Sequence, residues 1–204
     1  MLQDFKVAAR VGKPQVTYRE SVTCAATHTE KYEKMLGGNI NTAGITLQIQ
    51  PVSELGDTAK SEFTAYGSNY YRCTVHGINA KNKAEGIPAE IFDAVHNGIV
   101  NSFNSGINYG YPCTDLAVTV TDIEYNEITT SVFAAESCAV VAFDKVCEAA
   151  KPALLEPVMD VELTSPKEFV GDAMSQITQR GGIISSLESK ASTELVHAQA
   201  PMAK

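Results

Sequence analysis

The sequence predicts an α/β protein, of the α+β kind, in which a larger domain is followed by a smaller strand–helix–strand–strand unit. Two observations carry this prediction. Several short segments alternate apolar and polar residues, which is typical of half-buried strands, and three longer segments repeat apolar residues at helical spacing. A break near Lys151-Pro152 separates the larger domain from the smaller unit in this 204-residue chain.

Four segments with the alternating pattern are predicted as strands of a mixed or antiparallel sheet. Apolar residues occupy every second position, and polar residues such as His76 fill the other face. The apolar positions are Ile45, Leu47 and Ile49; Tyr71, Cys73 and Val75; Leu116, Val118 and Val120; and Met159, Val161 and Leu163. Residues 5–11 and 193–200 are also strand-like.

The first predicted helix begins at Pro88, a residue that favours the first helical position, and ends at Ser105-Gly106. Its core face repeats every fourth residue, at Ile91, Val95, Ile99 and Phe103. The second predicted helix follows Thr129-Thr130-Ser131 and stops before Pro152. We expect its buried stripe to consist of Val140, Phe143 and Cys147.

The third predicted helix has the clearest boundaries. Ser165-Pro166-Lys167-Glu168 has the form of a capping box with proline in the first turn, and Gly181-Gly182 supplies a left-handed stop. Two other segments are predicted to lack regular structure. Ser53 to Ser68 is a long polar connection, and Gly37–Thr42 is a turn that leads into the strand from Ile45.

The composition restricts the classes of function. A formal net charge of -8 argues against free-standing binding to nucleic acid, because such binding depends on lysine and arginine neutralising phosphates. No apolar run approaches the roughly 20 residues that cross a bilayer, and the first residues lack the apolar core of a signal peptide. A cytoplasmic location is therefore predicted.

The cysteines form no C-x-x-C pair, so neither a disulfide framework nor a zinc ribbon is predicted. Cys24 and His28 have a metal-like spacing, but two ligands do not make a site. A thiol–imidazole pair of Cys24 or Cys73 with His28 or His76 is the enzyme alternative, although no local signature supports it. We predict no catalytic, metal or cofactor site within these residues.

Three passages of the chain resemble one family. Val11–Glu20 has the sequence VGKPQVTYRE and resembles the vGkPqVaYRE passage that joins the third and fourth domains of bacterial elongation factor G. Gly110-Tyr111-Pro112 with Asp115–Val120 is similar to the family's GyPvvDvkvtl. A third passage resembles the opening of the family's fifth domain, which reads LLEPiMkVEv…P…GD…RRG. The matching residues are Leu154–Glu162, Pro166, Gly171-Asp172 and Arg180-Gly181.

The resemblance covers essentially the whole chain in order. It implies the end of a preceding domain at 1–11, an elongation factor G domain-four βαβ fold at 12–152, and a truncated, partial ferredoxin-like β-α-β-β domain five at 153–204. The strand-like chain ends also predict a piece of a longer protein. GTP and magnesium would belong to a GTPase domain of that parent, because G-x-x-x-x-G-K-[ST] does not occur here.

In that family the fourth domain enters the ribosomal A site and holds the tRNA–mRNA duplex in the decoding region during translocation, with two loops at its tip. By position, the resemblance assigns these rRNA and tRNA contact loops to Gly37, Gly38, Asn39, Ile40, Asn41 and Thr42, and to Glu124, Tyr125, Asn126 and Glu127. From spacing alone, Gly37–Thr42 would simply close a hairpin, and Asn126 would be an ordinary turn residue.

Both loops depart from the family pattern. Asn39 stands where the family's GGrGqyg has arginine, and Asn126 stands where YHeVDSS has histidine. Asparagine still hydrogen-bonds to RNA but carries no positive charge. The alternatives beside an orthodox translocase are a divergent second paralogue, a form that recycles ribosomes and a resistance-type ribosomal protection protein.

A stand-alone interaction module is the alternative of another class. The smaller unit has one helix for its sheet where the ferredoxin-like pattern has two. An uncovered sheet face and an unpaired strand edge are adhesive, so we expect self-association through this unit.

Overall fold

The computed structural model describes residues 15–75, 86–190 and 192–203. The predicted strand at 5–11, the predicted boundary at residue 11 and His76 lie outside the described residues. Two compact units are present, one spanning Arg19–Leu155 and a smaller one that includes the chain from Glu156 onward. Each unit is described by itself below.

The larger unit is built on a five-stranded sheet with the order β2-β3-β6-β5-β4. Neighbouring strands are antiparallel except β5 and β6, which are parallel, so the predicted mixed sheet is confirmed. The strands are β2 (Ala26–Leu36), β3 (Asn39–Pro51), β4 (Thr64–Tyr66), β5 (Asn69–Cys73) and β6 (Leu116–Glu124). Ile45, Leu47, Ile49, Leu116, Val118 and Val120 are buried, as the alternation predicts.

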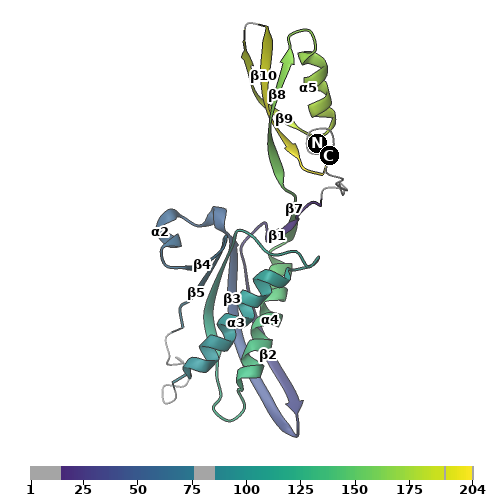
Figure 1. The fold of residues 1–204 in the computed structure, drawn as a ribbon. Helices are drawn as coiled ribbons and strands as arrows, with labels where there is room; N and C mark the ends of the chain where they lie inside the picture. The colour runs from purple at the N-terminus through teal and green to yellow at the C-terminus, as the bar shows by residue number, and fades with distance from the viewer. Residues whose placement is uncertain (1–14, 76–85, 191, 204) are drawn as a thin grey trace, which may run out of the picture. The chain divides into compact units, whose positions relative to one another are not determined.

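Two long helices, α3 (Ala89–Ser105) and α4 (Val132–Ala149), lie together across one face of this sheet (Figure 1). Helix α3 connects the parallel strands β5 and β6, which makes the expected βαβ crossover. Its predicted core face is confirmed, because Ile91, Val95, Ile99 and Phe103 are all buried. The apolar core of the unit lies between this helix pair and the sheet.

The ends of both helices follow from local chemistry. Pro88 is the N-cap of α3, so the helix begins at Ala89, one residue later than predicted. Gly106 ends α3 with a φ of 82°, an angle that favours glycine. Ser131 caps α4 as its N-cap, since its side chain accepts a hydrogen bond from the Ala134 N–H at 3.1 Å. The predicted start of α4 after Thr129–Ser131 is thereby confirmed.

The predicted buried stripe of α4 is partly wrong. Phe143 and Cys147 are fully buried, but Val140 is 36% exposed. The reason is that α4 turns its small residues inward to approach α3 closely. A Cβ placed on Gly98 of α3 would lie 3.0 Å from the Cβ of Ala139, so this contact leaves no room for larger side chains.

The segment from Ser53 to Ser68 is not the long irregular loop that its polarity predicts. It contains part of the short 3-10 helix η1 (Val52–Glu54), the helix α2 (Asp57–Lys60) and the strand β4, which pairs with β5. A second, two-stranded sheet pairs β1 (Arg19–Val22) with β7 (Pro152–Leu155), so the two ends of the larger unit run antiparallel beside each other.

The smaller unit has the predicted β-α-β-β order. It consists of β8 (Val158–Pro166), α5 (Val170–Gln179), β9 (Ile183–Ser189) and β10 (Thr193–Pro201). The strands form an antiparallel sheet with the order β8-β10-β9. Among its described residues, Val196 and Ala198 are the only buried apolar side chains.

The predicted capping box of α5 is wrong. Ser165 and Pro166 belong to the end of β8, and Phe169 is the N-cap, without a side-chain hydrogen bond. A turn closed by the Phe169 N–H and the Pro166 carbonyl at 3.0 Å comes between strand and helix, which moves Glu168 out of the position that a capping box requires. The predicted stop is confirmed, since Gly181 has a φ of 78°.

Candidate nucleic-acid interface

The first predicted contact loop is a tight hairpin between β2 and β3. Gly37 and Gly38 form its two-residue turn, and their φ values of 58° and 85° are the positive angles that such turns demand. The predicted loop of Gly37–Thr42 is therefore too long. Asn39–Thr42 are the first residues of β3 and pair with β2, because a two-residue turn needs no further residues to reverse the chain.

The second predicted loop is a turn organised by Asn126. Its side-chain oxygen accepts hydrogen bonds from the backbone N–H groups of Ile128 at 2.9 Å and Thr129 at 3.3 Å. Its own N–H donates to the Thr130 hydroxyl at 2.9 Å. Asn126 thus holds the shape of the loop, a role that asparagine performs well because its short side chain reaches the backbone two residues ahead.

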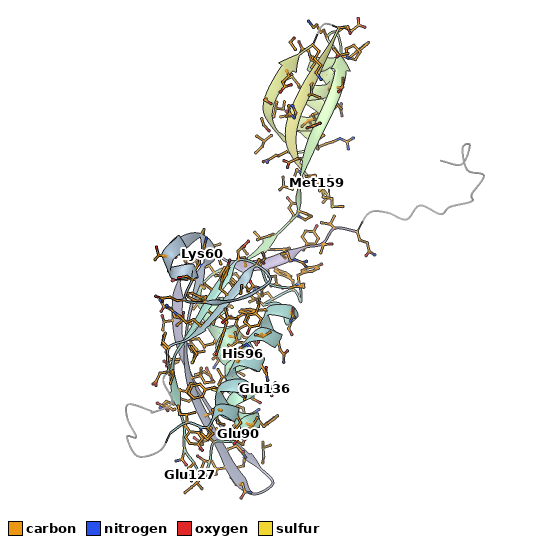
Figure 2. All side chains as sticks on the ribbon, turned by 60° about the vertical axis from the view of Figure 1, so that its left-hand side comes forward. Lys60, Glu90, His96, Glu127, Glu136 and Met159 are labelled. Atoms are coloured by element: carbon orange, nitrogen blue, oxygen red, sulfur yellow. The ribbon has the colours of Figure 1, made fainter. Side chains whose placement is uncertain are left out.

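The structure joins the two predicted loops at one end of the larger unit. The Thr42 N–H donates to the Thr129 carbonyl at 2.8 Å, and the two threonine hydroxyls are 2.5 Å apart. The Ser131 hydroxyl donates to the side-chain oxygen of Asn41 at 2.9 Å. Figure 2 labels Glu127 at this end, beside the β2–β3 hairpin. We call this end of the unit, residues 35–44 and 124–131, the tip.

Two open hollows lie at the tip. One is lined by Leu36, Gly38, Asn39, Ile40, Asn41 and residues 128–131. The other includes Thr42, Gly44, Glu124, Tyr125 and Asn126 among its lining residues. Glu124 lies over Gly44, where an added Cβ would be 2.8 Å from the Glu124 Cβ, and it forms an ion pair with Lys31 at 3.3 Å.

The tip also exposes apolar residues outside the two predicted contact loops. Met35 is 69% exposed and Ile128 is 93% exposed, and Leu36 is exposed as well. Met35 and Ile40 are cross-strand partners in the hairpin. Two consecutive apolar residues, Met35 and Leu36, interrupt the polar alternation of β2 just before the turn, and this was the sequence signal for them.

The described residues considered for an enzyme or metal site, Cys24, His28 and Cys73, each have an ordinary partner in the fold. His28 Nε2 bonds to Glu30 Oε2 at 2.8 Å, and the Cys24 thiol donates to the Ala150 carbonyl at 3.3 Å. Burial raises the pKa of the Cys73 thiol above its ordinary value, which keeps the thiol protonated at neutral pH. Across 15–75, 86–190 and 192–203, no group of three or more His, Cys, Asp or Glu residues could hold a metal ion.

A buried carboxylate links two of the passages that resemble the family. Glu20 is 1% exposed and accepts hydrogen bonds from the N–H groups of Asn108 at 2.6 Å, Tyr111 at 3.0 Å and Tyr109 at 3.1 Å. Burial alone would raise the pKa of Glu20, but these backbone donors outweigh it and lower the pKa below its ordinary value. Glu20 therefore fixes the connection between α3 and β6.

The larger unit is a helix-covered mixed sheet with two joined loops at one end, and the chain continues into a β-α-β-β unit, which is an α+β class of protein. Comparison with protein families is more specific. Residues 14–151 match the family model of elongation factor G, domain IV, and residues 153–204 match that of the elongation factor G C-terminus. The chain belongs to the elongation factor G family.

Individual proteins agree with this assignment. Elongation factor G 1 of Treponema denticola is 54% identical over 204 residues, which are all of this chain and 29% of the relative. Elongation factor G 2 of Treponema pallidum is 43% identical over 206 residues, and the match includes all of this chain and 28% of that relative. A crystal structure from Thermus thermophilus has a TM-score of 0.69 and 31% identity, over 99% of this chain and 27% of that one.

The chain spans less than a third of the length of the curated relatives that it matches. None of the described helices combines the length and the hydropathy that a membrane span requires.

Proposed function

We propose that this chain is the arm and the following unit of a cytoplasmic translational GTPase, and that the arm enters the ribosomal A site to promote GTP-dependent translocation of tRNA and mRNA. The observation that carries the proposal is the joining of both predicted contact loops into one tip. In this proposal GTP and magnesium bind a separate domain of the parent protein, and the described residues act by shape and contact.

The tip has the properties that close contact with an RNA surface requires. The turn at Gly37 and Gly38 has no side chains, and a Cβ added to either glycine would meet nothing within 4 Å. Asn126 and the threonine pair fix the second loop against the hairpin, so little conformational entropy is lost on binding. A preorganised tip of this kind can hold an RNA duplex by its shape.

The test uses the full-length factor with an Asn126→Asp substitution. Aspartate keeps the side-chain oxygen that accepts from Ile128 and Thr129, but it adds a negative charge at the tip. We expect translocation to slow by about tenfold, which corresponds to roughly 1.4 kcal/mol of activation free energy, with GTP binding unchanged. Rapid-mixing measurements of mRNA movement on pre-translocation ribosomes report this rate.

Asn101→Asp is the matched control, because it makes the same chemical change at an exposed position of α3. It should leave translocation at the parental rate. Equal rates for Asn126→Asp, Asn101→Asp and the parent would show that the tip does not approach RNA, and the proposed function would be abandoned.

Ribosome recycling is the second candidate, and the uncharged Asn126 favours it because the family pattern has histidine there. The same full-length factor is mixed with ribosomes and recycling factor, and subunit splitting is followed by light scattering. Splitting without mRNA movement would assign the chain to recycling. Rapid mRNA movement without splitting would assign it to translocation.

We also propose that the isolated chain self-associates through its smaller unit. The apolar side chains of Val158, Met159, Phe169, Ile183 and Leu187 are exposed there. Ile183, which is 72% exposed, is the position to change. Sedimentation at rising concentration should show a dimer that Ile183→Asp weakens, and a strict monomer at high concentration would exclude the proposal.

A further inference from the structure

Helix α4 is apolar on two sides. Its inner side, which includes Ala135, Ala139 and Phe143, is buried against α3 and the sheet. Its opposite side carries a second set of apolar residues. We call this set the outer stripe, and it consists of Phe133, Val140 and Val141. The exposed side of a surface helix is ordinarily polar.

The outer stripe is a surface feature and not a poorly packed part of the core. Phe133 is 57% exposed, and Val140 and Val141 are each 36% exposed. Phe133, Val140 and Val141 lie seven and eight residues apart, which places them on one side of the helix. Exposing them gains nothing for folding, because apolar side chains stabilise a protein only when they leave water.

The charges around the outer stripe are mainly acidic. Glu136 lies at one edge, and Asp144 and Glu148 continue the same side of the helix toward its C-terminal end. The one nearby cation on α4, Lys145, donates to both carboxylate oxygens of Glu30 on β2, at 2.9 Å and 2.8 Å. An acidic rim repels the phosphates of RNA, and it would also repel the same rim of a second copy.

We propose that the outer stripe of α4 is a protein-docking surface whose partner presents apolar side chains rimmed by lysine or arginine. Complementary charge selects this partner over RNA and over self-association, and an apolar centre with a charged rim is the common anatomy of a protein interface. The inference rests on the proposed function in one respect, which is that the partner is sought on the ribosome.

Photo-crosslinking tests the proposal directly. A benzophenone amino acid replaces Phe133 in the full-length factor, which is bound to purified ribosomes with a GTP analogue that is not hydrolysed. Matched probes replace Ile128 at the tip and Tyr109 in the connection between α3 and β6, two other exposed residues with large apolar surfaces. We expect the probe at 133 to attach to a ribosomal protein, at a segment with apolar and basic residues, well above the yield at 109.

The outcomes separate this inference from the proposed function. Adducts to RNA from the tip probe, with none above the control from the probe at 133, would overturn the docking surface and leave the proposed function standing. The absence of ribosomal adducts from both probes would overturn both. Adducts from position 133 to RNA alone, or to a second copy of the factor, would also overturn the docking surface.

Substitutions give a second, independent measurement. Phe133→Asp should weaken ribosome binding by about tenfold, while Phe133→Leu should retain it. Aspartate is favourable in the first turn of a helix, so the thermal stability of the factor should not fall. Asp144→Lys should weaken binding less, and that effect should diminish at high salt. Unchanged binding in Phe133→Asp would overturn the proposal.

Discussion

The two units of this chain differ in how many of their apolar side chains are buried. In the larger unit, two helices and the central strands bury an extended apolar core. The smaller unit, within its described residues, buries the apolar side chains of Val196 and Ala198 and little else. Helix α5 has a clear apolar side, yet none of its residues is buried. An amphipathic pattern therefore predicts which side faces inward, but it does not predict how much is covered.

The largest expected effect is a cavity in the core of the larger unit. Phe143 is fully buried and packs edge-on against Phe103, with ring centroids 5.8 Å apart. Phe143→Ala should lower the free energy of unfolding by about 3–5 kcal/mol, as measured by denaturant titration. Phe133→Ala, an exposed phenylalanine of the same helix, should change it by less than about 0.5 kcal/mol. Equal costs would mean that α4 is not oriented as described.

The second effect concerns the buried carboxylate of the larger unit. Glu20→Gln keeps the size of the side chain but turns an NH2 group toward backbone donors, so the free energy of unfolding should fall by about 2–3 kcal/mol. Chemical denaturation at neutral pH measures the loss. A cost near zero would show that the connection between α3 and β6 does not depend on Glu20.

The same carboxylate makes stability depend on pH with a defined sign. The pKa of Glu20 is lowered in the folded state, so its contribution is complete above the unfolded pKa of about 4.3 and is lost as the pH falls through the lower, folded pKa. Unfolding measured from pH 7 down to pH 3 should show this loss. In Glu20→Gln the part of the slope due to Glu20 should disappear, whereas an unchanged slope would assign it to other carboxylates.

The smallest effect compares the two units with one kind of substitution. Val146 and Val196 are both fully buried, one in each unit. Val146→Ala should cost about 2 kcal/mol and Val196→Ala about 1 kcal/mol, because a thinly covered site collapses more easily around a small cavity. Calorimetric unfolding of both variants measures the difference. A larger cost for Val196→Ala would reverse the comparison between the units.

Much of the fold could be predicted because it depends on local periodicity. The alternation at Ile45, Leu47 and Ile49 and the helical repeat from Ile91 to Phe103 are confirmed. The errors arise where tertiary contacts decide the outcome. Val140 lies outside the core because Gly98 and Ala139 bring two helices together, and no pattern within α4 records that neighbour.

In the candidate site, too, only part of the structure could be predicted from the sequence. The two loops could be located from the resemblance, but the roles of their residues could not. Asn126 holds a turn through its side-chain oxygen, and Thr42 joins the hairpin to Thr129, a residue 87 positions away. Such pairs depend on how the chain folds back on itself. That these residues contact RNA stays a prediction.

The pairing of β1 with β7 has a mechanical consequence. Arg19 is opposite Leu155 and Val22 is opposite Pro152, so the chain enters and leaves the larger unit at the same end of a short antiparallel ribbon. A pull on the two flanking segments would load this ribbon at its outer end, where Arg19 pairs with Leu155. The next residue, Glu20, would pass the load to the connection between α3 and β6 through its hydrogen bonds, so this connection would bear tension before the tip.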